Sequence, residues 1–142
     1  MSKILIPVDG SEASAAVLKT LPAWLGRLAG AAEIHLINVQ HPVGQDVGQF
    51  VGHDKLQDFH REEGLKALAA VHAGLAAAGI EASRHVLVGE DAAAVITGFA
   101  REQGCDAIFM TTHGRGALAK LFLGSVASEV VRLADVPVTL VK

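Results

Sequence analysis

DAIFMTTHGRGALAKLFLGSVAS, residues 106–128, joins a short apolar run to a glycine-rich basic loop and then to the start of a helical pattern. The run at 106–110 predicts a buried strand. The loop contains Gly114, Gly116 and Gly124, carries Arg115 and Lys120, and has no acidic residue. A strand, such a loop and a helix N-terminus together favour an anion, because free backbone N–H groups and the helix dipole point at the same place.

Outward from this stretch, apolar runs alternate with helical patterns along the whole chain. Helical patterns separate the runs, which predicts parallel strands covered on both faces. The fold class is therefore α/β: one domain, a three-layer sandwich around a five-stranded parallel sheet, spanning residues 1–142. The predicted strands are 3–8, 33–40, 82–88, 106–110 and 136–141.

The helical patterns carry their own start and stop signals. Asp9, with Glu12 three residues on, suits an N-cap of the first helix, which Pro22 is expected to kink or split. The second helix is predicted over 54–78 with Leu56 and Phe59 facing inward. The third and fourth helices are predicted over 91–103 and 125–134. Gly79 and Gly104 suit the residues that follow the second and third helices.

The bulk composition excludes several classes of protein. The chain has 142 residues, a formal net charge of −3 and one cysteine. The negative charge disfavours a general nucleic-acid binder. No apolar run reaches the ~18 residues of a membrane span. A chain that opens directly into a strand, with a lone cysteine, is expected to be cytoplasmic.

In an open parallel sheet, ligands bind where the strands end at their carboxyl edge. The segments there are 8–10, 39–40, 88–90 and 111–116. Other chemistry has weak support. GRGALA, residues 114–119, matches a dinucleotide pattern but follows the fourth strand, and no P-loop sequence or nucleophile elbow occurs. The 7 histidines have no spacing typical of a metal site. Cys105 is expected to be a buried, unreactive thiol.

Two motifs in order resemble the universal stress protein family. One is P-x-D-x-S after the first strand, here Pro7 to Ser11. The other is G-x2-G-x9-G-[ST] after the fourth, matched by Gly114-x9-Gly124-Ser125 but with Thr111 in place of the first glycine. The sequence from Gly124 to Val141 is also similar to the family's C-terminal stretch, so that the resemblance covers the whole chain.

This resemblance implies strand order 3-2-1-4-5 and a site for ATP with magnesium. Gly114, Gly124 and Ser125 would hold phosphates, Asp9 would lie near the ribose and the metal ion, and Val39 would offer backbone groups to adenine. The complete candidate set, with the segments at the sheet edge, is Pro7, Val8, Asp9, Val39, Gly89, Thr111, Gly114, Arg115, Gly116, Gly124, Ser125 and Val126.

The implied function is a stress-responsive regulator that binds ATP. Slow ATP hydrolysis stays open, since Asp9 and a magnesium ion could orient water, but no dedicated catalytic base stands out. The alternative is a dimeric interaction module of the same fold that binds no nucleotide. Thr111 bears on that choice: a β-branched residue blocks a close phosphate approach, but is harmless if the position needs only strand geometry. A redox protein is a weaker third interpretation.

Two further expectations concern interfaces. The strand at 136–141 would lie at a sheet edge, where pairing with a second copy would cover it, and the resemblance also implies a homodimer through this strand. The glycine-rich segment 41–53 is expected to be a lid beside the adenine position.

Overall fold

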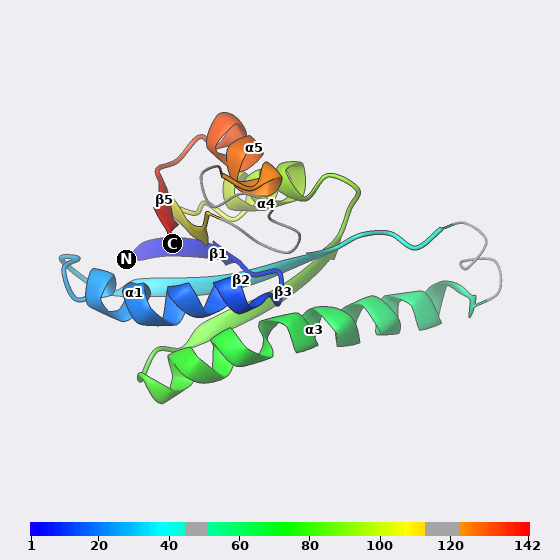
Figure 1. Ribbon diagram of the computed structural model, residues 1–142, viewed down its shortest axis with the longest axis horizontal. Helices are drawn as coiled ribbons and strands as arrows, with labels where there is room; N and C mark the ends of the chain where they lie inside the picture. Colours follow the sequence, from blue (N-terminus) through cyan, green and yellow to red (C-terminus); the bar gives the residue numbers. More distant parts are fainter. Residues whose placement is uncertain (45–50, 113–122) are drawn as a thin grey trace.

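The computed structural model describes residues 1–44, 51–112 and 123–142, and these residues form a three-layer α/β sandwich (Figure 1). A single parallel sheet has the strand order β3-β2-β1-β4-β5. This confirms the predicted fold class and the order that the family resemblance implies. The strands are β1 (Ser2–Pro7), β2 (Ala32–Gln40), β3 (Ala82–Val88), β4 (Ala107–Thr111) and β5 (Val138–Val141).

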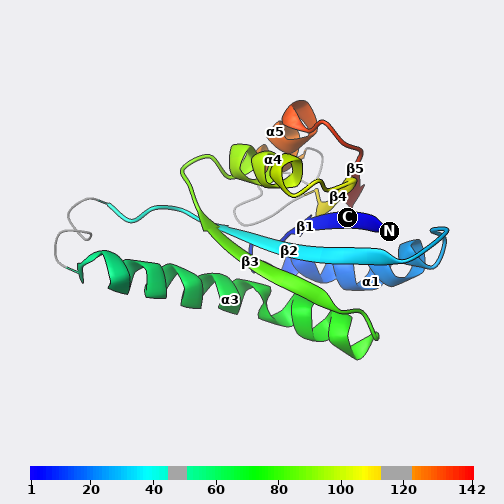
Figure 2. The ribbon, with the colours of Figure 1, turned by 180° about the vertical axis from the view of Figure 1, so that it is seen from behind.

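Helices cover both faces of this sheet. A short 3-10 turn, η1 (Glu12–Ser14), leads into α1 (Ala15–Leu25), and α1 lies beside α3 (His53–Ala77) on one face. The other face is covered by α4 (Ala92–Glu102) and α5 (Ser125–Leu133), as the views from both sides show (Figures 1 and 2). No helix among the described residues is long and apolar enough to cross a membrane.

Alternation along the strands divides the core into two clusters. In β2, Ile34 and Leu36 pack toward α1 and α3, whereas Ile37 packs toward α4 and α5. The same alternation in β1 sends Ile4 and Ile6 to the first cluster and Leu5 to the second. The central strands β1 and β2 therefore bury side chains on both faces, which explains why their apolar runs in the sequence are nearly continuous.

Two glycines let α3 lie close to its neighbours. A β-carbon at Gly64 would collide with the side chain of Val86 on β3. A β-carbon at Gly74 would lie 2.5 Å from a methyl group of Leu18 on α1. The absence of a side chain at these two positions thus sets how closely α3 approaches the sheet edge and α1.

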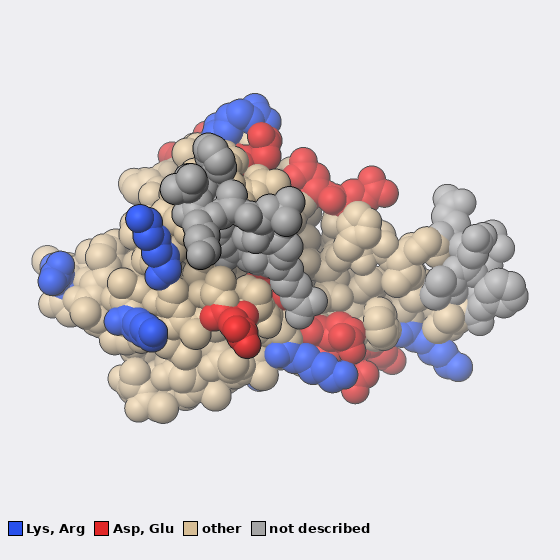
Figure 3. All heavy atoms as spheres, in the orientation of Figure 1, with Lys and Arg blue, Asp and Glu red and all other residues tan. Residues whose placement is uncertain are grey.

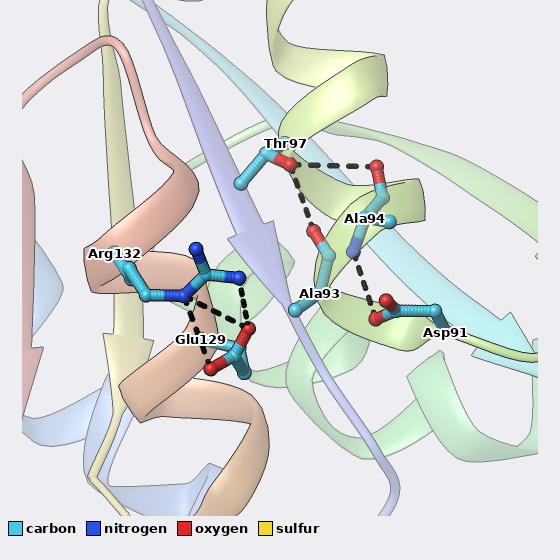
Figure 4. Close-up of polar contacts among 6 residues, drawn as sticks. All are labelled: Asp91, Ala93, Ala94, Thr97, Glu129 and Arg132. Atoms are coloured by element: carbon cyan, nitrogen blue, oxygen red, sulfur yellow. Dashed lines mark hydrogen bonds and ion pairs between the residues drawn. The ribbon is translucent and has the colours of Figure 1, made fainter.

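Several of the expected helix ends are present. The Asp91 carboxylate accepts a hydrogen bond from the Ala94 N–H at 3.1 Å and caps α4 (Figure 4). At the end of α3, Gly79 has φ of +77°, and the Ile80 N–H donates to the Leu75 carbonyl at 2.9 Å. This is the glycine-terminated helix end that the sequence predicted. Gly104 has φ of +65° in the same role after α4.

Three local expectations were wrong. The N-cap residues of η1 and α1 are Ser11 and Ser14 rather than Asp9. Pro22 does not split the first helix: α1 runs without interruption from Ala15 to Leu25, and ends one turn later than the proline. Phe59 is 44% exposed rather than inward, because the N-terminal half of α3 extends past the end of the sheet (Figures 1 and 2).

Candidate functional site

The candidate site lies where β1 and β4 end side by side at the carboxyl edge of the sheet. These two strands pair in parallel through Ile4 with Ala107 and Leu5 with Ile108. Beyond β1, Val8 stays buried, and its N–H donates to the Ile37 carbonyl at 2.9 Å. The strand order reverses between these two strands, which is where ligands bind in open α/β sheets.

The segment after β1 is a tight turn built around Asp9. The Asp9 Oδ1 atom accepts hydrogen bonds from the Ser11 N–H at 2.9 Å and from the Ser14 hydroxyl at 3.4 Å. Gly10 has φ of +82°, a conformation that L-residues rarely adopt. Asp9 therefore stabilises a turn rather than a helix end, while its side chain stays at the exposed rim of the site.

Ser11 brings a polar atom to this turn that sequence reasoning did not single out. Its Oγ atom is buried and has no hydrogen-bond partner among the residues that the structure describes. Buried hydroxyl groups nearly always have a hydrogen-bond partner in native proteins, so this hydroxyl beside Asp9 is an exception. The P-x-D-x-S pattern contains this serine, so that pattern could have identified Ser11 from the sequence.

A second residue that the sequence did not reveal, Asn38, supports the end of β1 from below. Its side chain is 4% exposed, and Nδ2 donates to the Val8 carbonyl at 2.8 Å. The Gln40 amide in turn donates to Asn38 Oδ1 at 2.7 Å, and His60 Nδ1 lies 3.5 Å from Gln40 Oε1. A chain of polar side chains thus runs from α3 to the backbone next to Asp9.

On the β4 side, backbone hydrogen bonds fix the start of α5 next to the strand end. The Thr112 N–H donates to the Val141 carbonyl at 2.9 Å, and the Gly124 N–H donates to the Thr112 carbonyl at 2.7 Å. Gly124 is the N-cap residue of α5 and supplies no side-chain cap. Ser125 and Val126, the first residues of α5, are exposed. Among residues 1–44, 51–112 and 123–142, no side chain of the N-cap residue caps this helix, so its first-turn N–H groups are candidates to bind a ligand or water.

The backbone angles of Gly124 do not explain why a glycine stands there. Its φ of −60° and ψ of 160° are open to any residue. A side chain at this position would thus be tolerated by the backbone itself. A substitution of Gly124 therefore tests whether there is room for a side chain at the start of α5.

Thr111 is the last residue of β4, in register with Val141 of β5. No residue other than glycine has a positive φ among the described residues, so threonine meets no backbone strain at this position. A β-branched residue suits a strand. The departure from the family motif is therefore compatible with the local backbone.

The other candidate site residues, Val39, Gly89 and Pro7, make different contacts with the rest of the protein. Val39 pairs with Leu87 of β3 and packs against the core under α4. Gly89 donates its N–H to the Gln40 carbonyl at 3.0 Å, and a β-carbon there would lie 2.5 Å from Val95 on α4. Packing against α4 alone accounts for the glycine at 89. Pro7 ends β1 and pairs with Ile37.

Gly114, Arg115 and Gly116 lie outside the described residues, as does the middle of the expected lid, residues 45–50. The described part of that segment includes His53, which is already the first residue of α3.

Away from this edge, β2 and β3 carry a second polar cluster on the α4 face. His35 Nδ1 lies 2.8 Å from His85 Nε2, and His35 Nε2 lies 2.6 Å from Glu33 Oε1. Burial lowers the pKa of His85, with the neighbouring His35 as the second cause. Within residues 1–44, 51–112 and 123–142, no three His, Cys, Asp or Glu side chains are placed to hold a metal ion.

Cys105 is buried, as predicted, and burial raises the pKa of its thiol. Because the thiolate is the nucleophilic form, a raised pKa leaves little of it at neutral pH.

The sheet order, with its reversal between β1 and β4, defines a doubly wound α/β protein whose candidate site is the sheet edge where α5 begins. The universal stress protein family model matches residues 1–142, and the chain belongs to that family. It is 32% identical to universal stress protein MJ0531 of Methanocaldococcus jannaschii, over 99% of this chain and 81% of that protein.

Solved structures agree with this assignment. The chain is similar to hypothetical protein MJ0577 with a TM-score of 0.79 and 29% identity, covering 99% of this chain and 95% of that one. The universal stress protein of Archaeoglobus fulgidus, solved in complex with dAMP, gives a TM-score of 0.67 at 23% identity, over 100% of this chain and 98% of that one. At 23% identity, this similarity supports the fold and nothing further.

Proposed function

We propose that this protein binds an adenine nucleotide at the carboxyl edge of β1 and β4 and acts as a regulator rather than as a dedicated enzyme. One observation carries the proposal: the uncapped start of α5 is tied to the end of β4 by the Gly124–Thr112 hydrogen bond, beside the strand that presents Asp9. Helix N–H groups at such a place favour phosphate.

The comparisons support the same ligand class. Universal stress proteins of this fold have been solved with dAMP, cAMP and AMP. In this chain the phosphates would lie at Gly124, Ser125 and Val126, and the Val39 backbone is the candidate contact for adenine. These assignments follow the Gly114-x9-Gly124-Ser125 match in the sequence.

More specifically, we propose that the nucleotide is ATP bound with magnesium. We also propose that the protein is cytoplasmic. A magnesium ion binds through one or two carboxylates together with substrate phosphates. Asp9 is exposed at the rim and offers one carboxylate, which fits such a shared site. When bound, the ion would neutralise phosphate charge, while Asp9 and the start of α5 hold the nucleotide in place.

Titration calorimetry of the full chain with AMP and with ATP, with and without magnesium, tests both the general proposal of adenine-nucleotide binding and the specific proposal of Mg-ATP binding. Micromolar affinity, about −8 kcal/mol, is expected for Mg-ATP. Binding of AMP but not of ATP would keep the nucleotide site and remove the finer claim. If no nucleotide binds at millimolar concentration, the protein is an interaction module instead.

Gly124→Val separates phosphate approach from folding. The backbone angles at this position accept valine, so a folded variant that has lost nucleotide binding supports close approach of a phosphate. Ser125→Ala is the milder companion and is expected to cost about 1–2 kcal/mol of binding free energy, the worth of one hydrogen bond to a charged group. A Gly124→Val protein that binds normally contradicts the assignment.

We also propose that two copies pair through β5. The Ile108 N–H donates to the Pro137 carbonyl and the Thr112 N–H to the Val141 carbonyl, so the odd-numbered residues of β5 face β4. The backbone groups of Val138 and Leu140 consequently point away from the sheet, at its edge. An uncovered edge of this kind is a ready partner for a second strand.

The side chains of Val138 and Leu140 pack against the core under α5, so lysine at these positions would damage folding as well as pairing. Leu140→Pro is the sharper variant, because it removes an outward N–H and leaves the bonds to β4 in place. Sedimentation equilibrium should show a dimer for the natural chain and a monomer for a folded Leu140→Pro protein. A mass of 14.7 kDa for the natural chain would reject the dimer.

A further inference from the structure

A cavity of about 500 Å³ lies between the N-terminal half of α3 and the end of β3, on the side of the sheet away from α4. This half of α3 runs past the carboxyl end of β3, where the two elements no longer close against each other (Figures 1 and 2). The volume lies within the range of small-molecule sites, ~300–1,000 Å³. No residue of the candidate nucleotide site lines the cavity.

The inner wall is apolar. It is formed by Leu56 of α3 and Val86 of β3; Leu87 also borders the cavity, but its side chain packs toward α4 on the other face of the sheet. Val88 continues the wall to the rim, where 48% of it is exposed, and Pro42 and Val43 close the cavity on the β2 side. An apolar wall with an open rim suits a ligand that has an apolar body.

The polar groups come from one stripe of α3. At about 100° per residue, positions 53, 57, 60 and 61 fall on the same side of the helix as Leu56. They supply His53, Gln57, His60 and Arg61 to the lining, which contains no acidic residue. Arg61 keeps its charge at any ordinary pH and makes no ion pair with any described residue.

The acids of the same helix segment form a stripe directly beside the one that lines the cavity. Asp54, Asp58 and Glu62 are spaced by four residues, form their own stripe and are exposed. Figure 3 shows acidic and basic side chains close together over this part of α3, so the segment as a whole is not a basic patch. Arg61 is nonetheless the one Lys, Arg, Asp or Glu side chain among the described residues that line the cavity.

His60 lines the cavity and also contacts a polar side chain of β2. The residue is 7% exposed, and its Nδ1 lies 3.5 Å from Gln40 Oε1. Its other ring nitrogen, Nε2, has no hydrogen-bond partner among the described residues. A nearly buried imidazole in the lining thus has one nitrogen available to a polar group of a ligand.

We propose that this cavity is a second binding site, for a small molecule with an apolar body and one carboxylate. The apolar body would lie against Leu56, Val86 and Val88. The carboxylate would lie at the rim, where the Arg61 guanidinium can bind it with two parallel hydrogen bonds. The site does not depend on the nucleotide proposal, because the two share no residue.

The test uses octanoate and octanol as matched probes in an amide-resolved NMR titration of the full chain. Both probes should shift the amide signals of residues 56–61 and 86–88, and octanoate should bind more tightly. Shifts confined to other parts of the chain, or none at millimolar concentration, would overturn the proposal. Competition between octanoate and AMP would overturn the claim that the cavity is a separate site.

Arg61→Gln tests the carboxylate contact. It should weaken octanoate binding at least about tenfold and leave octanol binding unchanged, since a hydrogen bond to a charged group is worth that much. Lys55→Gln, which removes a cation from the same helix but outside the cavity, is the matched control. An equal loss in both variants would reduce the effect to general charge attraction and overturn the assignment.

Val88→Asp gives an independent check at the end of β3 that lines the cavity. A carboxylate at this exposed strand end should weaken octanoate binding more than octanol binding. A variant that binds octanoate as well as the natural chain does would show that the carboxylate lies elsewhere, which contradicts the proposed orientation.

Discussion

The two faces of β2 carry different kinds of polar chain. Toward α3, Asn38 and Gln40 link His60 to the Val8 carbonyl through amide groups. Toward α4, Glu33 and His35 link to His85 of β3. The first chain lies at the carboxyl end of the strand, next to the candidate site, and the second lies toward its amino end.

The difference lies in how each chain responds to protons. The amide groups of Asn38 and Gln40 do not titrate, so the bond from Asn38 to the Val8 carbonyl and the bond from Gln40 to Asn38 persist across the physiological pH range. The contact between His35 and His85 needs one ring nitrogen to accept, so the pair cannot hold a proton on every nitrogen. The turn that carries Asp9 is therefore supported by the chain that pH does not change.

The largest expected effect comes from Asn38→Leu. Leucine fills similar space but leaves the buried Val8 carbonyl without its donor, which should lower the free energy of unfolding by about 1–3 kcal/mol. Urea denaturation measures this loss. If the nucleotide proposal holds, affinity should also fall, because Asp9 follows Val8 directly.

Gln40→Leu is the matched control for that change. It removes the outer link and keeps the bond from Asn38 to Val8, so the loss should be smaller, under about 1 kcal/mol. Equal losses for the two variants would show that the chain acts as one unit and that the Val8 bond has no special weight.

A smaller effect is expected from the histidine chain, and it depends on pH. The pKa of His85 is lowered in the folded protein, so the unfolded chain takes up this proton first as pH falls. The contribution to stability is present above pH ~6.5 and is lost as pH falls from there toward the folded pKa. His85→Gln, which keeps a donor for His35, should flatten the stability curve between pH 7 and 5.

Thermal melting of both proteins across this pH range provides the comparison. Parallel curves for His85→Gln and the natural chain would mean that His85 titrates alike in the folded and unfolded states. Such a result would remove the contrast between the two faces.

Glu33→Gln should have the smallest effect. Its hydrogen bond to His35 lowers the pKa of Glu33, but the carboxylate is exposed and the glutamine oxygen can accept the same bond. The contribution is present above the ordinary glutamate pKa and is lost as pH falls through the lowered one. Melting temperatures at neutral pH should be almost unchanged. A large drop would show that charge, not geometry, holds His35.

Much of the fold could be predicted from the sequence, because each strand is a short apolar run that is bounded by turn residues. The strand at 82–88 matches β3 at both ends. Strand order came from the family resemblance, since crossover connections of similar length fit several orders. The failures at Pro22 and Phe59 share a cause: tertiary packing decided where α1 ends and how far α3 extends beyond the sheet.

The candidate site was less accessible to sequence reasoning. The sequence placed Asp9, Gly124 and Ser125 at the carboxyl edge of the sheet, where the structure has them, because strand ends and helix starts are local features. Asn38 was missed because its partner, Val8, lies 30 residues away and only the strand register brings them together. His35 and His85 were missed for the same reason, as they come from strands 50 residues apart.

Gly64 has a consequence for how this molecule could diversify. The glycine lets α3 contact Val86, and the proposed second site begins one turn earlier, at His60 and Arg61. A larger residue at 64 would displace either α3 or the Val86 side chain, which lines the cavity, and would thus change the shape of the proposed site. One position outside the cavity would therefore control its shape, and a Gly64→Ala exchange is the shortest route to relatives that accept molecules of a different shape.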